Sequence, residues 1–373
     1  VQLVSGDMSI TGIGTVTYAG PEGILAFGHP MMVRGFCSFP MTTAWIHTVM
    51  PSLQVSFKMG SPLKLVGTVN QDRQPAIAGT LGTMPDTIPV KMDVSYGGTD
   101  SRYSYTIIRD KLLFPKLLST VMLNTLTEKS AKMGELSCRL EYRLTFEETA
   151  SGKTREVSFT DSWAALDTMP SFSNALAQIL NPMLYILFNP WAAVRLRNVD
   201  IKVQSLPDVR AIQITDLRAD VKKVRPGDTI TLRVELTPWQ GEPFWQTVSL
   251  KVPQATRNGK IFFVVSGKAH ERFYDRFFAP ARHQPATLDH LLQIFNMDRD
   301  NSKLVVWSEL YQTGLIINGQ QHPDLPESQF KLFAGSQAKA MGTINARLMK
   351  EYKTNYYIYG MKVIFMEVDY TRW

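Results

Sequence analysis

Short runs of alternating apolar and polar residues dominate the first third of the chain. They are rich in Val, Ile, Thr and Tyr, and segments with Gly, Pro or Asp separate them. The runs are VQLV, TVTY, GILAF, QVSF, LKLVGTV, IPVKMDV and YSYTII. Strands this short, at such regular spacing, favour a barrel or a sandwich over residues 1–112.

The pattern changes after residue 112. Apolar residues at helical spacing predict one helix within residues 111–132 and another within 171–188, with Ser171 or Ser173 as the expected N-cap. Between them, LSCRLEYRLTFEE alternates, and a turn at SGK leads to a return strand, REVSFTD. Residues 113–198 are therefore interpreted as a connecting region of helices and a β-hairpin.

A second β-rich region follows, over residues 199–373. The runs IKVQSL, TITLRVELTPW, TVSLKV and KIFFVVSG alternate, and RPGD at 225–228 predicts a tight turn between two strands. This pattern is typical of an immunoglobulin-like sandwich, although no Cys-Trp-Cys signature is present. A short helix within 286–297 and further strands predict a C-terminal α+β region. The expected fold is mainly β: a barrel portion, then a sandwich, with a few inserted helices.

Bulk composition fits a globular protein with more than one core. The chain has 373 residues, of which 44% are hydrophobic and 20% charged. The net charge is +7, but the Lys and Arg residues are scattered, so we expect a solvated surface and no nucleic-acid partner. The longest apolar stretch, residues 182–194, is interrupted by Asn189 and Pro190 and is too short to cross a bilayer. It predicts a core or interface helix, and no transmembrane segment is expected.

Neither the cysteines nor the histidines form a metal-binding pattern. Cys37 and Cys138 are about a hundred residues apart and belong to no C-x-x-C motif. They either pair in an oxidising compartment or remain free thiols. No two histidines have the spacing of a zinc motif. We therefore expect no metal and no cofactor.

His29 is the strongest candidate for chemistry. It follows an apolar run in GILAFGHP, where Gly28 permits a sharp bend and Pro30 lacks a backbone N–H. A histidine placed at a strand end on a rigid scaffold suits a general base, whereas the alternative is a turn histidine without catalytic role. His47 lies in an apolar run and is expected in the core. Ser61, in GSP, reads as a turn serine, so no nucleophile is apparent.

A resemblance to a family follows from the order of these segments. GIGTVTY, GILAFGHP, SPLKLVGTV with NQDRQPAIAG, and IPVKMDV resemble the SpoIVB-type serine peptidases over about residues 1–112. In that family a GIGT-x-T strand precedes a Gly-His pair that carries the catalytic histidine. The resemblance implies a chymotrypsin-like double barrel, a Ser-His-Asp type mechanism, limited or self-proteolysis, and export from the bacterial cytoplasm. His29 would be the general base.

Two departures qualify what the resemblance implies. The family's nucleophile motif, G-M-S-G-S-P, has no counterpart here, so the serine would lie upstream of Val1, in a fragment that acts as a partner. The aspartate expected soon after the Gly-His pair is also missing from PMMVRGFC.

The alternative is a catalytically inactive scaffold on a peptidase fold that mediates protein–protein assembly in the cell envelope. Exposed aromatics in the C-terminal region would favour it; the candidates are Trp239, Trp245, Tyr356, Tyr357 and Trp373. A carbohydrate- or lipid-binding envelope protein is a third alternative, which only the sandwich supports.

Overall fold

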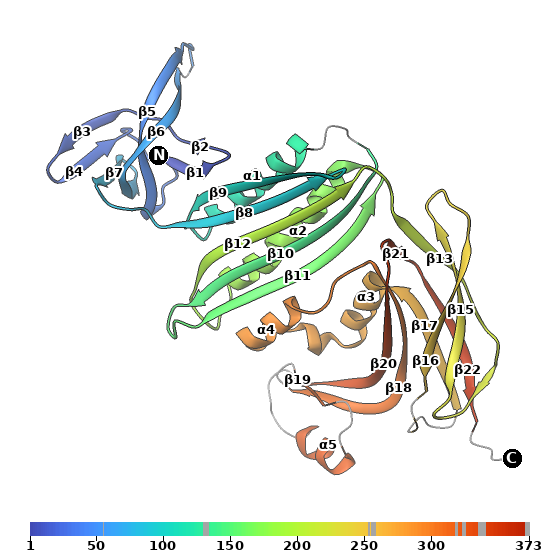
Figure 1. The fold of residues 1–373 in the computed structure, drawn as a ribbon. Coiled ribbons are helices and arrows are strands. Elements are labelled where there is room, and N and C mark those ends of the chain that lie inside the picture. Colours follow the sequence, from blue (N-terminus) through green and yellow to red (C-terminus); the bar gives the residue numbers. More distant parts are fainter. Residues whose placement is uncertain are drawn as a thin grey trace.

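The computed structural model shows a mainly β protein, as the alternation predicts (Figure 1). Several sheets, one of them a half-barrel, carry most of the chain, and a few helices are inserted between strands. The structure describes residues 1–54, 56–129, 134–252, 254, 259–317, 320–322, 326–334 and 341–369.

Residues 16–81 form the half-barrel, an antiparallel sheet of five strands in the order β3-β4-β7-β6-β5. The strands are β3 (Val16–Gly20), β4 (Gly23–Ala26), β5 (Gly35–Met50), β6 (Phe57–Arg73) and β7 (Ala76–Leu81). The long β5–β6 hairpin pairs from Gly35 opposite Asp72 to Met50 opposite Phe57. Its distal end projects away from the body of the molecule (Figure 1).

A central sheet of seven strands lies next to the half-barrel, in the order β11-β10-β12-β8-β9-β1-β2. The strands are β1 (Gln2–Gly6), β2 (Ile10–Thr11), β8 (Thr87–Tyr96), β9 (Thr99–Ile108), β10 (Leu136–Glu148), β11 (Thr154–Ala165) and β12 (Val194–Leu206). The strands expected within residues 1–112 are thus divided between two sheets. A parallel pairing of β12 with β8 joins the segment before residue 112 to the segment after it.

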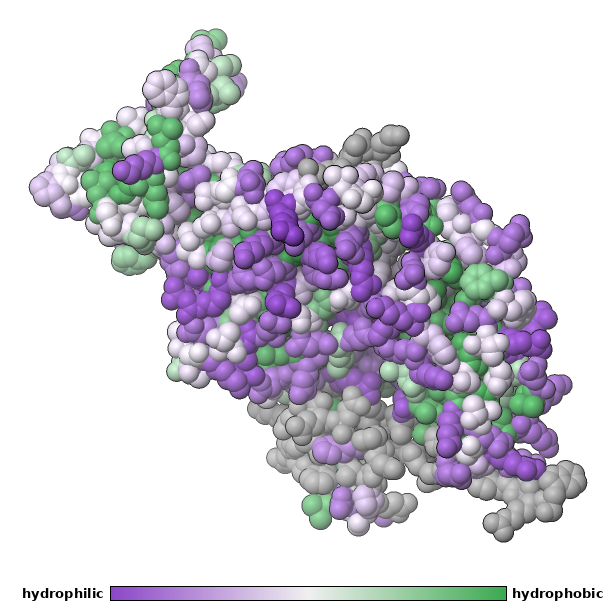
Figure 2. All heavy atoms as spheres, viewed as in Figure 1, coloured by the Kyte–Doolittle hydropathy of each residue, from purple (hydrophilic) through white to green (hydrophobic). Residues whose placement is uncertain are grey.

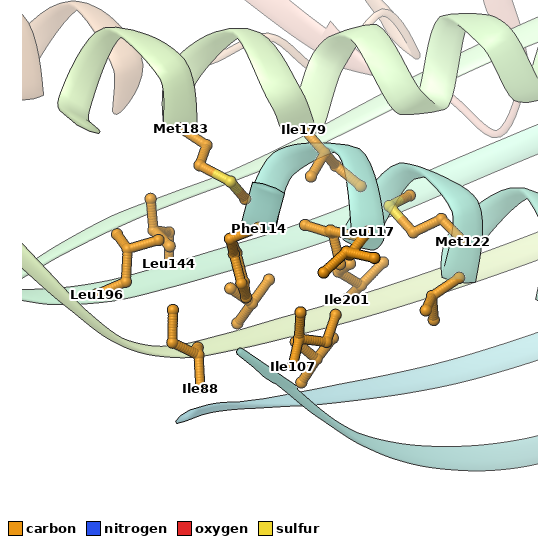
Figure 3. Close-up of a cluster of buried hydrophobic side chains, with 14 of the residues drawn as sticks. Ile88, Ile107, Phe114, Leu117, Met122, Leu144, Ile179, Met183, Leu196 and Ile201 are labelled. Atoms are coloured by element: carbon orange, nitrogen blue, oxygen red, sulfur yellow. The ribbon is translucent and has the colours of Figure 1, made fainter. Parts of the chain in front are cut away.

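Two helices cover one face of the central sheet, α1 (Leu113–Lys129) and α2 (Thr168–Leu187). Figure 3 shows apolar side chains from both helices pointing into a core shared with the sheet, among them Phe114, Ile179 and Met183. Both helices were predicted, but the N-cap of α2 was not. Asp167 caps it by accepting a hydrogen bond from the backbone N–H of Met169.

The C-terminal region packs two sheets face to face around a second core. The smaller has the order β16-β15-β13-β21, and the larger contains β14-β22-β17-β18-β19, with β20 also paired to β18. The strands are β13 (Ala211–Ala219), β14 (Lys223–Val224), β15 (Thr229–Pro238), β16 (Phe244–Lys251), β17 (Gly259–Gly267), β18 (Lys303–Ile317), β19 (Gln320–His322), β20 (Met341–Lys353), β21 (Tyr357–Tyr359) and β22 (Met361–Val368).

The remaining described helices are α3 (Lys268–Phe278), η1 (Pro280–His283), α4 (Leu288–Phe295) and α5 (Glu327–Ala334). Helix α3 packs against the larger C-terminal sheet, whereas α4 packs against β11 and joins the core of the central sheet. The loop after α4 joins the C-terminal region to β11: Asn301 donates to the buried carboxylate of Asp161, and Ser162 donates to Asp300. None of the helices in the described part of the chain is long and apolar enough to span a bilayer.

Candidate functional site

His29 lies in an exposed loop directly after β4. Phe27 and Gly28 both have positive φ, 74° and 72°, so the chain turns sharply before the histidine. The ring Nδ1 is 2.8 Å from the carbonyl oxygen of Pro30. Because a carbonyl can only accept, Nδ1 carries the proton in this bond, and the Nε2 of the neutral ring keeps its lone pair. The local geometry therefore leaves Nε2 free to act as a base.

A buried carboxylate holds the loop that follows His29. Asp72 of β6 accepts hydrogen bonds from the backbone N–H groups of Met31, Met32 and Arg34, at 2.7, 2.8 and 3.1 Å. These bonds satisfy the buried charge and fix a segment in which Val33 also has positive φ. Asp72 supports the backbone of the loop rather than the imidazole.

Another histidine of the half-barrel, His47, lies against the hydroxyl group of Ser61. Their Oγ and Nε2 atoms are 2.8 Å apart on the β5–β6 hairpin. Both predictions for these residues were wrong: His47 is exposed rather than in the core, and Ser61 lies within a 17-residue strand rather than in a turn. In the described part of the chain, no carboxylate hydrogen-bonds to His47 or to His29. Neither histidine therefore belongs to a complete Ser-His-Asp arrangement within these residues.

Exposed apolar side chains are concentrated on the half-barrel. Figure 2 shows hydrophobic residues gathered on this lobe, whereas the neighbouring central sheet is largely hydrophilic on the same side. Trp45 is 62% exposed and Leu63 is 63% exposed. Further exposed side chains on the strands are Val16, Tyr18, Leu25, Phe36, Ile46, Val49, Met50, Phe57, Met59 and Leu81. Apolar surface of this extent on one sheet makes it a candidate binding surface.

The thiols and the acidic side chains offer no metal site in the described residues. Cys37 and Cys138 are free, and burial raises the pKa of each thiol to about 12. Such thiols are poor nucleophiles at neutral pH. Cys37 lies on the half-barrel and Cys138 on the central sheet.

A groove of about 810 Å³ lies on the face of the central sheet opposite α1 and α2. Its charges alternate across the strands: Asp200 is paired between Lys91 and Arg143, and Lys202 between Asp93 and Glu141. Cross-strand neighbours of opposite sign compensate one another. The groove consequently presents no field of a single sign.

The aromatics proposed for a binding surface in the C-terminal region are partly exposed. Trp239, Trp245 and Tyr356 are exposed, Tyr357 is half-buried, and Trp373 lies outside the described residues. Arg218 stacks over the ring of Trp245, with 4.7 Å between its Cζ and the ring centroid. These side chains are dispersed in comparison with those of the half-barrel.

Comparison with known proteins adds no relative to this description. No protein-family model, no curated protein and no solved structure matches the chain.

Proposed function

We propose that the half-barrel is a docking element that a partner polypeptide completes, so that the protein works as a scaffold for assembly in the cell envelope. The observation that carries this proposal is the uncovered apolar sheet. Among its described residues, the half-barrel fully buries only Ala26, Phe39, Val69 and Ile77 of its apolar side chains. A sheet with so small a core of its own gains stability when another layer covers it.

The free energy that a covering layer contributes by burying these side chains is large. Burying a side chain such as Trp45, Phe57 or Leu63 contributes about 1–2 kcal/mol each at ~25 cal/mol per Å². Several such side chains would supply the energy of a stable complex even after association entropy is subtracted. The resemblance to SpoIVB-type peptidases suggests the identity of the layer: a further piece of a chymotrypsin-like barrel, encoded upstream in the same gene. On this proposal the C-terminal sheets form an immunoglobulin-like sandwich that carries other contacts.

A second candidate function is peptidase activity of the completed barrel, outside the bacterial cytoplasm. The observation that favours it is the Nδ1–Pro30 hydrogen bond, which leaves Nε2 of His29 as a base. In the reaction, a serine Oγ supplied by the partner would attack the scissile carbonyl while Nε2 accepts its proton. The imidazolium would then protonate the leaving amine. His29 lacks a carboxylate partner among the described residues, so assembly ranks first and catalysis second.

Photo-crosslinking tests the docking proposal. A benzophenone amino acid at position Leu63, introduced in cells that produce the protein, should capture one polypeptide in high yield. The same probe at Val221, an exposed apolar position far from the half-barrel in the chain, is the control. Sequencing of the captured peptide identifies the covering layer. Equal, diffuse labelling from both positions would contradict the proposal.

Labelling of the complex that crosslinking identifies tests the second candidate function, peptidase activity. A fluorophosphonate probe should label a serine of the partner in that complex. His29→Ala should lower the labelling rate by about 10³-fold or more, whereas His47→Ala should leave it unchanged. Labelling that does not depend on His29 would reject His29 as the base and leave the scaffold proposal intact.

A further inference from the structure

Helix α3 has an inverted polarity: three of its charged residues are buried and three of its phenylalanines face solvent. Lys268, Glu271 and Asp275 are buried. Phe273 is 72% exposed and Phe277 is 70% exposed. An ordinary surface helix buries its apolar stripe. An exposed aromatic stripe on a helix anchored by charges therefore requires a separate explanation.

Ion pairs hold α3 in this orientation. Lys268 lies 2.7 Å from a carboxylate oxygen of Glu351 and 3.1 Å from one of Glu271. Arg347 of β20 reaches both Glu271, at 2.8 Å, and Asp275, at 3.1 Å. Rotating the helix to bury its phenylalanines would break these buried pairs, at a cost of several kcal/mol. The aromatic side is consequently fixed outward.

The exposed phenylalanines belong to a continuous row of rings that crosses the outer face of the larger C-terminal sheet, which we call the aromatic ladder. Consecutive ring centroids are between 4.1 and 6.5 Å apart. The ladder runs Phe365, Phe262, Trp307, Tyr274, Phe278, Phe277 and Phe273. Trp307 at its centre is fully buried, and Arg347 lies over its ring at 4.9 Å. The ends of the ladder are open to solvent, so the buried centre anchors the exposed rings.

Arg276 lies beside the exposed rings of α3. The exposed residues of α3 are three phenylalanines, His270 and Arg276. The two acids of the helix are buried in the ion pairs described above. At the other end of the ladder, beyond Phe365, Lys223 lies 3.6 Å from Glu367 and 3.9 Å from Asp369, so basic charge is not in excess there. The α3 end of the ladder therefore combines exposed aromatic rings with one basic side chain that no exposed acid of the helix compensates.

We propose that the exposed α3 end of the aromatic ladder binds the surface of an anionic lipid membrane, with Phe273 and Phe277 inserted at the level of the headgroups and Arg276 beside the lipid phosphates. Aromatic and basic side chains presented on one helix are the composition of interfacial membrane-binding helices. A second copy of the chain is a poorer occupant, because it would bring Arg276 against a surface of the same sign. The rigid anchoring by ion pairs means that no refolding is needed for insertion.

Vesicle flotation of the full chain tests this proposal. The protein should float with vesicles of equal parts phosphatidylcholine and phosphatidylglycerol, and less with pure phosphatidylcholine. The double variant Phe273→Ser/Phe277→Ser should reduce the partition coefficient by about tenfold or more. Phe244→Ser, an exposed phenylalanine of β16, is the matched control and should leave it unchanged. Arg276→Gln should selectively reduce the preference for the anionic vesicles.

Three results would overturn the proposal. One is the absence of flotation with either vesicle. Another is an equal loss for Phe244→Ser and the α3 double variant, which would show unspecific adhesion of apolar surface. The third is a dimer in sedimentation that the α3 double variant abolishes, which would make a second copy the occupant. Thermal unfolding of the variants establishes that they fold. None of these results depends on what covers the half-barrel.

Discussion

The half-barrel and the central sheet are made of similar strands, yet they are covered to different extents. Helices α1 and α2 cover a face of the central sheet, whereas the described residues of the half-barrel contribute only four buried apolar side chains to the same core. Leu140, Leu144 and Phe146 of the central sheet are fully buried, whereas Leu63 and Trp45 of the half-barrel lie open. Alternation along a strand determines which side chains share a face. It does not determine whether another layer covers that face.

The difference arises from what lies between the strands in the sequence. Residues 87–206 include α1 and α2, which fold back onto the sheet they interrupt. In residues 16–81, no described residue belongs to a helix. On the docking proposal, the cover of the half-barrel comes from another polypeptide. This contrast supports a docking role better than any single residue does.

Alanine substitutions of one leucine in each region sharpen the comparison, and they include the largest expected effect on the free energy of unfolding. Leu118→Ala on α1 should lower the free energy of unfolding by about 2–5 kcal/mol, because it leaves a cavity in the central core. Leu63→Ala on the half-barrel should change it by about 0.5 kcal/mol or less. Guanidinium denaturation of the isolated chain measures both. Comparable losses would mean that Leu63 is covered in solution.

The central sheet also contacts the C-terminal region. The buried carboxylate of Asp161 on β11 makes part of this contact, because it accepts a hydrogen bond from Asn301. Burial raises the pKa of Asp161 from 3.8 to about 6, against the attraction of Arg272. Because the folded pKa is raised, the protonated form favours folding. The stabilisation of the folded state by protonated Asp161 is fully present below pH 4 and is lost as the pH rises through about 6.

The variant Asp161→Asn tests this linkage. Between pH 4 and pH 7 the wild type should lose about 3 kcal/mol of stability relative to the variant. Urea denaturation at several pH values measures the difference. A constant difference across this range would show that Asp161 ionises normally.

A third test concerns the loop that carries His29. Asp72→Asn replaces one acceptor oxygen by an N–H₂ group that faces backbone donors, so we expect a loss of about 2 kcal/mol. Hydrogen exchange at Met31, Met32 and Arg34 should accelerate in this variant. Unchanged protection of these amides would show that the loop is held by other contacts.

The smallest effect is expected at the N-cap of α2. Asp167→Ala should lower stability by about 1 kcal/mol, because the N–H of Met169 loses its acceptor. Ser173→Ala, at a cap candidate suggested by the sequence, should be near neutral. Thermal unfolding of both variants distinguishes them. A larger loss for Ser173→Ala would contradict the cap assignment.

Local patterns in the sequence predicted the secondary structure well but not the layers. The apolar spacing in 111–132 and 171–188 identified both central helices, and the alternation from Leu140 to Phe146 identified β10. The parallel pairing of Val90 with Val199 joins segments a hundred residues apart, and no local pattern encodes it. The half-barrel and the strands β1, β2, β8 and β9 of the central sheet were consequently predicted as one domain, apart from β10, β11 and β12.

The candidate sites were predictable to a lesser degree. The bend at Gly28 follows from its neighbours, and the structure shows positive φ there. The role of Asp72 depends on a contact between β6 and a distant loop. Ser61 resembled a turn residue because Gly60 and Pro62 flank it, yet the hairpin continues through them. Helix α3 is amphipathic, but its buried side carries Lys268, Glu271 and Asp275, so its pattern would have predicted the wrong side as buried.

Hydrogen–deuterium exchange on the isolated chain tests the central claim most directly. If the half-barrel lacks its cover, amides of β5 and β6 beyond the first few residue pairs should exchange much faster than those of β10 and β12. Adding the captured partner should protect β5 and β6 and leave β10 unchanged. Equal protection of the two sheets in the isolated chain would contradict the account, because the half-barrel would then be complete without a partner.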